Sequence, residues 1–431
     1  MGTETAKNQE QKLFYHVLGT AQSEDALVFE DAAHPEWMFG AEVSNDGKYL
    51  IVTTNYSCED LNRVHLVSLE DASLSAAPVA LVDDFVASFG YITNEGPVFY
   101  FQSNLDAPRG SLLSVDISDP AALCNPRGWK AVLPQHPSDV LSHVSCVNQS
   151  HFVVIYMKDV VDRLYLHALD GQLLSEITLP SLGCVSGLST RKKDAFFYFK
   201  FTSFAYPGTI FRHDFGEPLL HTHYQTVVEG VSPADFVAEQ EWFASKDGTK
   251  IPMFVVRHKD VPRHGQQTPA YLYGYGGFNI SIQPSFSTSQ LFFMQYFRGI
   301  LAIANIRGGG EYGEEWHHAG VKGHKQNVFD DFCAAAEYLV ATKATVPSLL
   351  TISGGSNGGT LVGACMNQRP ELFGCCVAHV GVFDMLQFHR FTIGMSNSLF
   401  FLVHFFFLTD SLCIFLFLSF FLCVFRLCLD F

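Results

Sequence analysis

LLTISGGSNGG, residues 349–359, predicts an apolar strand that runs directly into the pattern G-x-S-x-G and then into a helix. Gly354 and Gly358 would let the strand and the helix approach closely, so that Ser356 occupies a strained turn with its hydroxyl exposed. The backbone N–H of Asn357 would then point from the start of the helix toward a developing oxyanion. This stretch predicts a nucleophilic serine in an α/β domain, and the structural alternative is a Gly-rich turn between a strand and a helix.

A second Gly-rich loop, YLYGYGGF at residues 271–278, follows another apolar strand. In α/β-hydrolase domains, a loop at this position supplies the second donor to the oxyanion. The alternative is a tight turn with aromatic side chains packed around it.

The sequence around these two loops alternates between apolar runs and helical patterns. Continuous apolar runs occur at 253–256, 270–273 and 300–306, and helical spacing is clearest at 329–340. Apolar strands that alternate with helices are typical of a parallel sheet covered on both faces. We therefore expect an α/β domain over residues 231–394.

Residues 13–230 show an all-β pattern instead. Short apolar or alternating runs are separated by turn residues such as Asp46-Gly47 and Asp170-Gly171, with no helical periods between them. This pattern fits a sandwich, a barrel or a propeller. The hairpin pairs recur every 40 to 50 residues, roughly, which favours a partial β-propeller of about four or five blades over residues 1–230.

The composition excludes several classes of function. The 431 residues carry 27 Lys and Arg against 43 Asp and Glu, a net charge of −16, whereas nucleic-acid binding needs clustered basic residues. The N-terminus has no basic segment followed by an apolar core, and the 11 Cys form no C-x-x-C pair. We therefore expect reduced thiols, no zinc site, no nucleic-acid partner and a cytoplasmic location.

Two further patterns are weaker. GGGEYG at residues 308–313 satisfies G-x-G-x-x-G, and Asp330 and Asp331 follow about twenty residues later. In a dinucleotide-binding fold, the Gly-rich motif lies in the first βα unit and the acidic residue lies at the end of the second strand. Here both Asp residues begin a helix instead. His317-His318 lacks carboxylate or Cys companions at ligand spacing. We expect neither a metal nor an organic cofactor.

Residues 395–431 form an anomalous apolar tail rich in Phe and Leu. From residue 396 onward only Asp410, Arg426 and Asp430 are charged, and no period of a strand or a helix is visible. One hypothesis is a membrane anchor, although Asp410 interrupts a span of sufficient length. The other is read-through into a pyrimidine-rich intron, because Phe, Leu, Ser and Cys have pyrimidine-rich codons.

Together these motifs resemble the prolyl oligopeptidase family, whose members are serine peptidases that pair an α/β-hydrolase domain with a β-propeller lid. The resemblance extends over residues 3–394, and the segments that carry it are 245–253, 272–280, 304–313 with Trp316, 329–339, 352–359 and 367–394. It implies that the partners are short proline-containing peptides, which are cut on the carboxyl side of proline. It also implies that the propeller keeps folded proteins out of the site. Nothing in the sequence favours an oligomer, so we expect a monomer.

By that resemblance Ser356 is the nucleophile that forms an acyl-enzyme. The backbone N–H of Asn357 and the hydroxyl of Tyr275 would form the oxyanion hole. The substrate pocket would be lined by five side chains, of which the first two contact the proline ring: Phe278, Val382, Met38, Cys58 and Ile393.

The sequence departs from the family pattern after Ser356. Chain order in this fold is Ser, Asp, His, and two more strand–helix units are needed before the Asp and the His could be placed. The histidines present are His379, His389 and His404, and none has the topological place of a catalytic base. We expect a chain truncated at both ends that lacks the catalytic Asp and His and is inactive. The alternative is a non-catalytic or membrane-associated splice variant that uses the propeller and the apolar tail.

Overall fold

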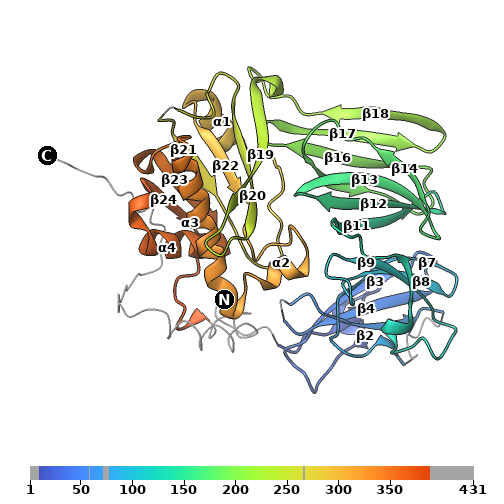
Figure 1. Ribbon diagram of the computed structural model, residues 1–431. Coiled ribbons are helices and arrows are strands. Elements are labelled where there is room, and N and C mark those ends of the chain that lie inside the picture. The colour runs from blue at the N-terminus through green and yellow to red at the C-terminus, as the bar shows by residue number, and fades with distance from the viewer. Residues whose placement is uncertain (1–8, 58, 71–76, 266, 389–431) are drawn as a thin grey trace.

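The computed structural model describes residues 9–57, 59–70, 77–265 and 267–388. Within them the chain forms four four-stranded sheets, a small two-stranded sheet and one six-stranded sheet with helices against it (Figure 1). The predicted fold class is confirmed, because propeller-like sheets come first and a partial α/β-hydrolase domain follows.

Each four-stranded sheet is an antiparallel meander in which every strand pairs with its neighbour in the chain. The strands, sheet by sheet, are β3 (Met38–Val43), β4 (Tyr49–Asn55), β5 (Arg63–Ser68) and β6 (Val79–Val82); β7 (Phe89–Glu95), β8 (Val98–Ser103), β9 (Ser111–Asp116) and β10 (Lys130–Leu133); β11 (Val140–Val147), β12 (His151–Lys158), β13 (Val161–Ala168) and β14 (Leu173–Ile177); and β15 (Cys184–Ser189), β16 (Phe196–Ser203), β17 (Tyr206–Asp214) and β18 (Glu217–Gln225). The small sheet pairs β1 (Leu13–Tyr15) with β2 (Ala26–Phe29).

The four sheets pack one against the next in chain order. Ile51 of the first sheet shares a core with Phe99 of the second. Tyr100, the next residue on β8, points to the other face and contacts Phe152 of the third sheet. The third and fourth sheets share a further core that contains Phe197. This serial stacking is typical of propeller blades, whereas a sandwich pairs two sheets around one core.

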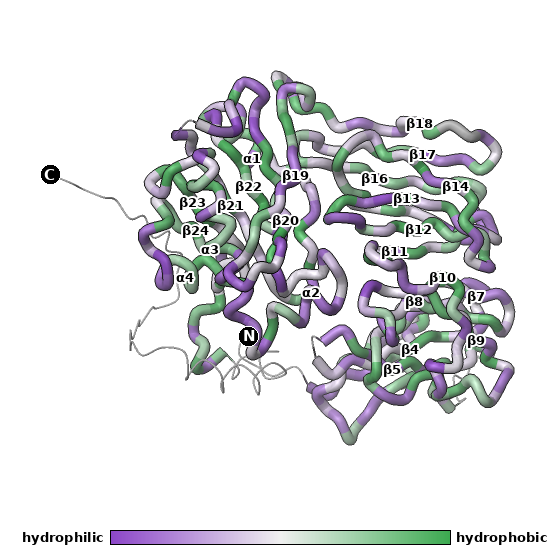
Figure 2. The backbone as a smooth tube through the Cα atoms, in the orientation of Figure 1, coloured by the Kyte–Doolittle hydropathy of each residue, from purple (hydrophilic) through white to green (hydrophobic). Residues whose placement is uncertain are grey.

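The six-stranded sheet has the order β19-β20-β22-β21-β23-β24. Its strands are β19 (Phe236–Ala244), β20 (Lys250–His258), β21 (Ala270–Tyr273), β22 (Ile300–Ala304), β23 (Leu350–Gly355) and β24 (Cys375–His379). β19 and β20 form an antiparallel hairpin, β20 pairs antiparallel with β22, and the four strands from β22 to β24 are parallel. β22 is buried along its whole length, and the interior strands are mostly hydrophobic in Figure 2.

Helices cover both faces of this sheet. α3 (Lys325–Ala341) and α4 (Asn357–Gln368) share a core with one face, through residues such as Phe332 and Leu361. α1 (Thr288–Tyr296) packs on the other face through Leu291 and Met294. The short α2 (Glu314–His318) lies on the side that faces the propeller-like sheets (Figure 1).

The two parts of the chain are joined by a shared apolar core and by polar contacts. Met157 and Phe204 of the four-stranded sheets lie in one core with Phe254 and Leu301 of the six-stranded sheet. Around it, the N–H of Glu314 donates to the carbonyl of Pro108 (2.7 Å), Gln240 Nε2 donates to the carbonyl of Asp159 (2.6 Å), and Gln283 Nε2 donates to Asp162 Oδ1 (2.6 Å). The blades are thus fixed against the sheet that carries the Gly-rich loops.

Two element boundaries differ from the sequence prediction. The apolar run at residues 375–382 predicts one strand, but β24 ends at His379, because Val380 has φ +44° and a strand cannot continue through that conformation. α3 begins at Lys325, four residues before the predicted helix. Among the helices that the structure describes, none combines the length and the apolar composition needed to cross a membrane. The tail at 395–431 lies outside the described residues.

Candidate active site

Ser356 occupies a sharp turn between β23 and α4. Its backbone has φ +54° and ψ −116°, a strained conformation for a residue with a side chain, and the residue is exposed. The N–H of Ser356 donates to the carbonyl of His379, the last residue of the neighbouring strand, at 2.9 Å. This is the geometry of a nucleophile elbow, in which the strand, the turn and the helix present one hydroxyl at the edge of the sheet.

The glycines on either side of Ser356 are needed for close packing. A Cβ on Gly354 would lie 2.3 Å from the carbonyl oxygen of Gly358 and 2.8 Å from that of Gly274. A Cβ on Gly358 would lie 2.7 Å from the same Gly274 oxygen. A Cβ on Gly355 would meet nothing closer than 3.9 Å. The predicted close approach of strand and helix at Gly354 and Gly358 is therefore confirmed.

The loop after β21 brings Tyr275 to the elbow. Burial raises the pKa of the Tyr275 hydroxyl, and the nearby Ser356 side chain opposes that rise. Asn357 is the first residue of α4, and its Nδ2 donates to the backbone carbonyl of Tyr275 at 2.6 Å. The structure thus brings together the three residues predicted for the nucleophile and the oxyanion hole.

Two of the predicted pocket residues lie on segments that adjoin the elbow. Phe278 follows Tyr275 in the same loop, has φ +54° and is 49% exposed. Val382 is 42% exposed, and its carbonyl accepts a hydrogen bond from Thr360 Oγ1 on the first turn of α4 at 2.8 Å. Their contact with a proline ring stays a prediction.

Of the other three predicted pocket residues, the structure describes one. Met38 is the first residue of β3 in the first propeller-like sheet, and it is 38% exposed. Cys58 and Ile393 lie outside the described residues, as do His389 and His404.

His379 is the remaining histidine that the sequence offers as a base. It ends β24 opposite Gly355, and its carbonyl is bonded to the Ser356 N–H. Among the described residues, no histidine ring is hydrogen-bonded to the Ser356 side chain.

Polar groups under the site were missed by sequence reasoning. Lys325 lies against the oxyanion loop, with its Nζ donating to the carbonyl of Gly276 (2.8 Å) and to Asn357 Oδ1 (3.1 Å). Burial lowers the pKa of this ammonium to about 8. A lysine at the start of a helix gives no sequence signal of such a contact, because exposed lysines are common there.

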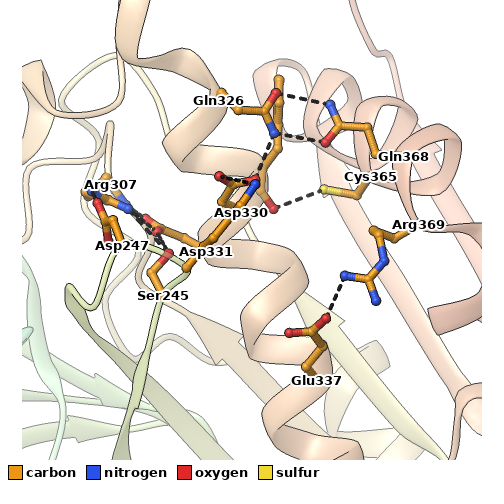
Figure 3. A network of polar contacts seen from close by, with 12 residues as sticks. Ser245, Asp247, Arg307, Gln326, Asp330, Asp331, Glu337, Cys365, Gln368 and Arg369 are labelled. Atoms are coloured by element: carbon orange, nitrogen blue, oxygen red, sulfur yellow. Dashed lines mark hydrogen bonds and ion pairs between the residues drawn. The ribbon is translucent and has the colours of Figure 1, made fainter.

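Arg307 forms a second buried cluster just beyond β22 (Figure 3). Its Nε donates to Asp331 Oδ2 (2.9 Å), and its terminal nitrogens donate to Asp331 Oδ1 (2.6 Å) and Asp247 Oδ2 (2.6 Å). Ser245 Oγ also donates to Asp331 Oδ1 (2.5 Å). Asp331, one of the two Asp residues that follow the G-x-G-x-x-G pattern, is therefore a structural partner of Arg307. Within the described residues, no group of three or more His, Cys, Asp and Glu side chains is placed to hold a metal ion.

The comparisons with known proteins agree with this architecture. Residues 1–223 match the prolyl oligopeptidase N-terminal β-propeller domain, and residues 284–398 match the prolyl oligopeptidase family. The chain is 39% identical over 404 residues to prolyl oligopeptidase A of Amanita bisporigera, covering 92% of this chain and 52% of that protein. It is 41% identical over 406 residues to prolyl endopeptidase of Dictyostelium discoideum, covering 92% and 53%.

A solved structure has the same fold. Prolyl oligopeptidase B of Galerina marginata, bound to a 25-residue macrocyclization substrate, superposes with a TM-score of 0.87 at 37% identity, covering 92% of this chain and 54% of that one. The chain thus spans about half the length of the relatives it matches. Because the propeller match alone covers more than half of its residues, this chain belongs to the prolyl oligopeptidase family.

Proposed function

We propose that this chain carries the nucleophile of a serine-type endopeptidase that cleaves short peptides on the carboxyl side of proline. The observation that carries the proposal is the exposed Ser356 on its strained turn, beside the loop of Tyr275, whose carbonyl accepts a hydrogen bond from the Asn357 side chain. The relative in D. discoideum is named a prolyl endopeptidase, which supports the preference for proline.

In the proposed reaction, Ser356 Oγ attacks the peptide carbonyl carbon and negative charge develops on the carbonyl oxygen. The N–H of Asn357 and the O–H of Tyr275 donate to that oxygen. Because burial raises the pKa of Tyr275, the phenol keeps its proton at neutral pH and remains a donor. Collapse of the intermediate releases the amine and leaves an ester on Ser356, which water then hydrolyses.

The reaction needs a base that takes the proton from Ser356. His379 is held through its backbone at the end of β24, and its ring has no hydrogen bond to Ser356. We therefore keep the sequence-based hypothesis that the 431-residue chain, assayed alone, does not turn over peptide. Loss of the base in a serine triad removes about 10⁶-fold of turnover, and an oxyanion hole alone retains about 10³- to 10⁴-fold over water.

The proposal also includes finer predictions about the substrate pocket, the domain boundaries and the location of the protein. Phe278 and Val382 would contact the proline ring, and Met38, Cys58 and Ile393 would line the pocket further out. The units are proposed to run over 1–230, 231–394 and 395–431, in a cytoplasmic monomer. The alternative of a membrane-associated splice variant depends on the tail, which lies outside the described residues.

Two measurements on the purified chain test the proposal. The first is hydrolysis of a fluorogenic Gly-Pro peptide with Ser356→Ala alongside, for which we expect no turnover from either protein. Turnover that disappears in the variant would show that a base is present and would refute the expected inactivity. The second is binding of a Gly-Pro peptide boronic acid, which forms a tetrahedral adduct with a reactive serine. We expect an adduct that Ser356→Ala abolishes and that a Gly-Leu boronic acid forms more weakly. Equal binding by Ser356→Ala would overturn the assignment of the nucleophile.

A further inference from the structure

A single buried ammonium connects the two segments of the oxyanion site. Lys325 Nζ donates to the carbonyl of Gly276 at 2.8 Å and to Asn357 Oδ1 at 3.1 Å. The other side of the same amide, Asn357 Nδ2, donates to the carbonyl of Tyr275 at 2.6 Å. Lys325 therefore fixes the loop that carries the Tyr275 hydroxyl and the residue that carries the second oxyanion donor.

The loop packs closely against the residues on both sides of it. A Cβ on Gly276 would lie 2.4 Å from Val328 Cγ1, one turn after Lys325 on α3. A Cβ on Gly277 would lie 2.5 Å from Asn357 Nδ2. The loop is thus pressed between the first turn of α3 and the Asn357 side chain. Loss of the lysine bonds would change the position of both oxyanion donors together.

The charge of Lys325 is not explained by folding. Among the described residues, no carboxylate lies within ion-pair distance of its ammonium, and burial lowers its pKa to about 8, so that it is still mainly protonated at neutral pH. A cation in the first turn of a helix also opposes the helix dipole. A charge that is withdrawn from solvent without a countercharge is unfavourable, and such groups concentrate at functional sites. Here the missing negative charge would be the oxyanion that forms at Ser356.

We propose that Lys325 is a positioning residue of the oxyanion site: it holds the Tyr275 loop against Asn357 and supplies the positive charge behind the two donors. This inference rests on the proposed function of Ser356. Lys325 does not contact the reacting atoms itself. It acts through Asn357 and the carbonyls of the loop, and its benefit is greatest when the bound group is anionic.

The test compares an anionic and a neutral ligand of the full chain. An N-acetylated Gly-Pro boronic acid gives a tetrahedral, negatively charged adduct on Ser356, whereas N-acetyl-Gly-Pro amide carries no charge and is a neutral ligand for the same pocket. Both are titrated at pH 7 by calorimetry into the wild type, Lys325→Met, Lys325→Gln and Lys325→Arg. We expect Lys325→Met and Lys325→Gln to weaken boronate binding by about 10- to 100-fold and to leave amide binding unchanged within about twofold. Lys325→Arg, which keeps the charge, should recover part of the loss.

The controls separate failure of this inference from failure of the proposed function. Lys343→Met removes an exposed lysine after the other end of the same helix and should bind boronate like the wild type. If Ser356→Ala abolishes the adduct but Lys325→Met binds as the wild type does, the inference is overturned and the proposed function stands. Equal weakening of boronate and amide, or full recovery by the uncharged Gln, would show a purely structural lysine and also overturn the inference. A wild type that forms no adduct would overturn the proposed function and this inference with it.

Discussion

Asp331→Asn should destabilise the α/β part of the chain far more than Asp247→Asn, although each substitution removes one carboxylate that pairs with Arg307. Asp331 is fully buried and accepts three hydrogen bonds from Arg307, from its backbone N–H, its Nε and one terminal nitrogen, and a fourth from Ser245. Asp247 accepts one bond from Arg307, and its side chain is 47% exposed.

The expected magnitudes follow from burial. An asparagine has one acceptor oxygen, so at Asp331 its NH₂ group would face a donor of Arg307 or Ser245, and the buried guanidinium would keep only the exposed Asp247 as a countercharge. Removal of one partner from a buried ion pair destabilises by about 3–5 kcal/mol. The Arg307 bond lowers the pKa of Asp247 to about 2, but solvent screening at this exposed carboxylate limits its contribution to about 1 kcal/mol or less.

Hydrogen–deuterium exchange with mass spectrometry measures these effects locally, without assuming that both parts of the chain unfold together. Because 1.4 kcal/mol is a factor of ten, amides of β22 and α3 should exchange about 10²- to 10⁴-fold faster in Asp331→Asn. In Asp247→Asn the factor should stay below about 10. The double variant Arg307→Met with Asp331→Leu should recover most of the protection, because it leaves no unpaired buried charge. Equal acceleration by the two single variants would refute the reasoning from burial.

Three more predictions concern the elbow and two buried ionisable groups. Gly354→Ala should unfold or displace the elbow, because its Cβ would meet a carbonyl oxygen at 2.3 Å, whereas Gly355→Ala should keep the native thermal midpoint; similar midpoints would contradict this. Burial raises the pKa of Glu311 to about 7 from 4.5. Between pH 4.5 and 7 the folded state therefore holds a proton that the unfolded state loses, so the free energy of unfolding should fall by up to about 3 kcal/mol over this range. Urea titrations should show this fall for the wild type and not for Glu311→Gln. For Lys325 the expected pH dependence has the opposite sign, because burial lowers its pKa to about 8 from 10.5. The free energy of unfolding should rise by up to about 3 kcal/mol from pH 8 to 10.5, and Lys325→Met should lack that rise.

The local pattern of the chain predicted the elbow because each of its requirements is local. An apolar strand, glycines where strand and helix meet, and a helix directly after Ser356 are all visible within residues 349–368, and the structure has them. The propeller-like sheets were predictable for a similar reason, because strands that pair with their chain neighbours need only turns at regular spacing.

What the sequence could not predict are contacts between distant segments. Arg307 meets Asp331 and Asp247 only because β22, α3 and the β19–β20 turn converge below the sheet. The end of β24 at His379 depends on the backbone of Val380, for which a β-branched residue in an apolar run gave the wrong expectation. A predicted pocket residue such as Met38 could line a site only through the placement of the propeller-like sheets against the six-stranded sheet, and spacing within one segment carries no information on that placement.

Three ionisable groups of the α/β part of the chain differ in how their charge is compensated, and the difference indicates where function lies. Arg307 is matched by carboxylates, so its charge is neutralised where it serves the fold. Within the described part of the chain no cation forms an ion pair with Glu311, and burial raises its pKa to about 7, so that the side chain keeps its proton below that pH. Lys325 differs from both at neutral pH, because it stays mainly protonated and forms no ion pair with a carboxylate among the described residues. Its ammonium lies against the two segments proposed to carry the oxyanion donors beside Ser356. We therefore attribute this cation to the negative charge that would appear in the proposed reaction at Ser356.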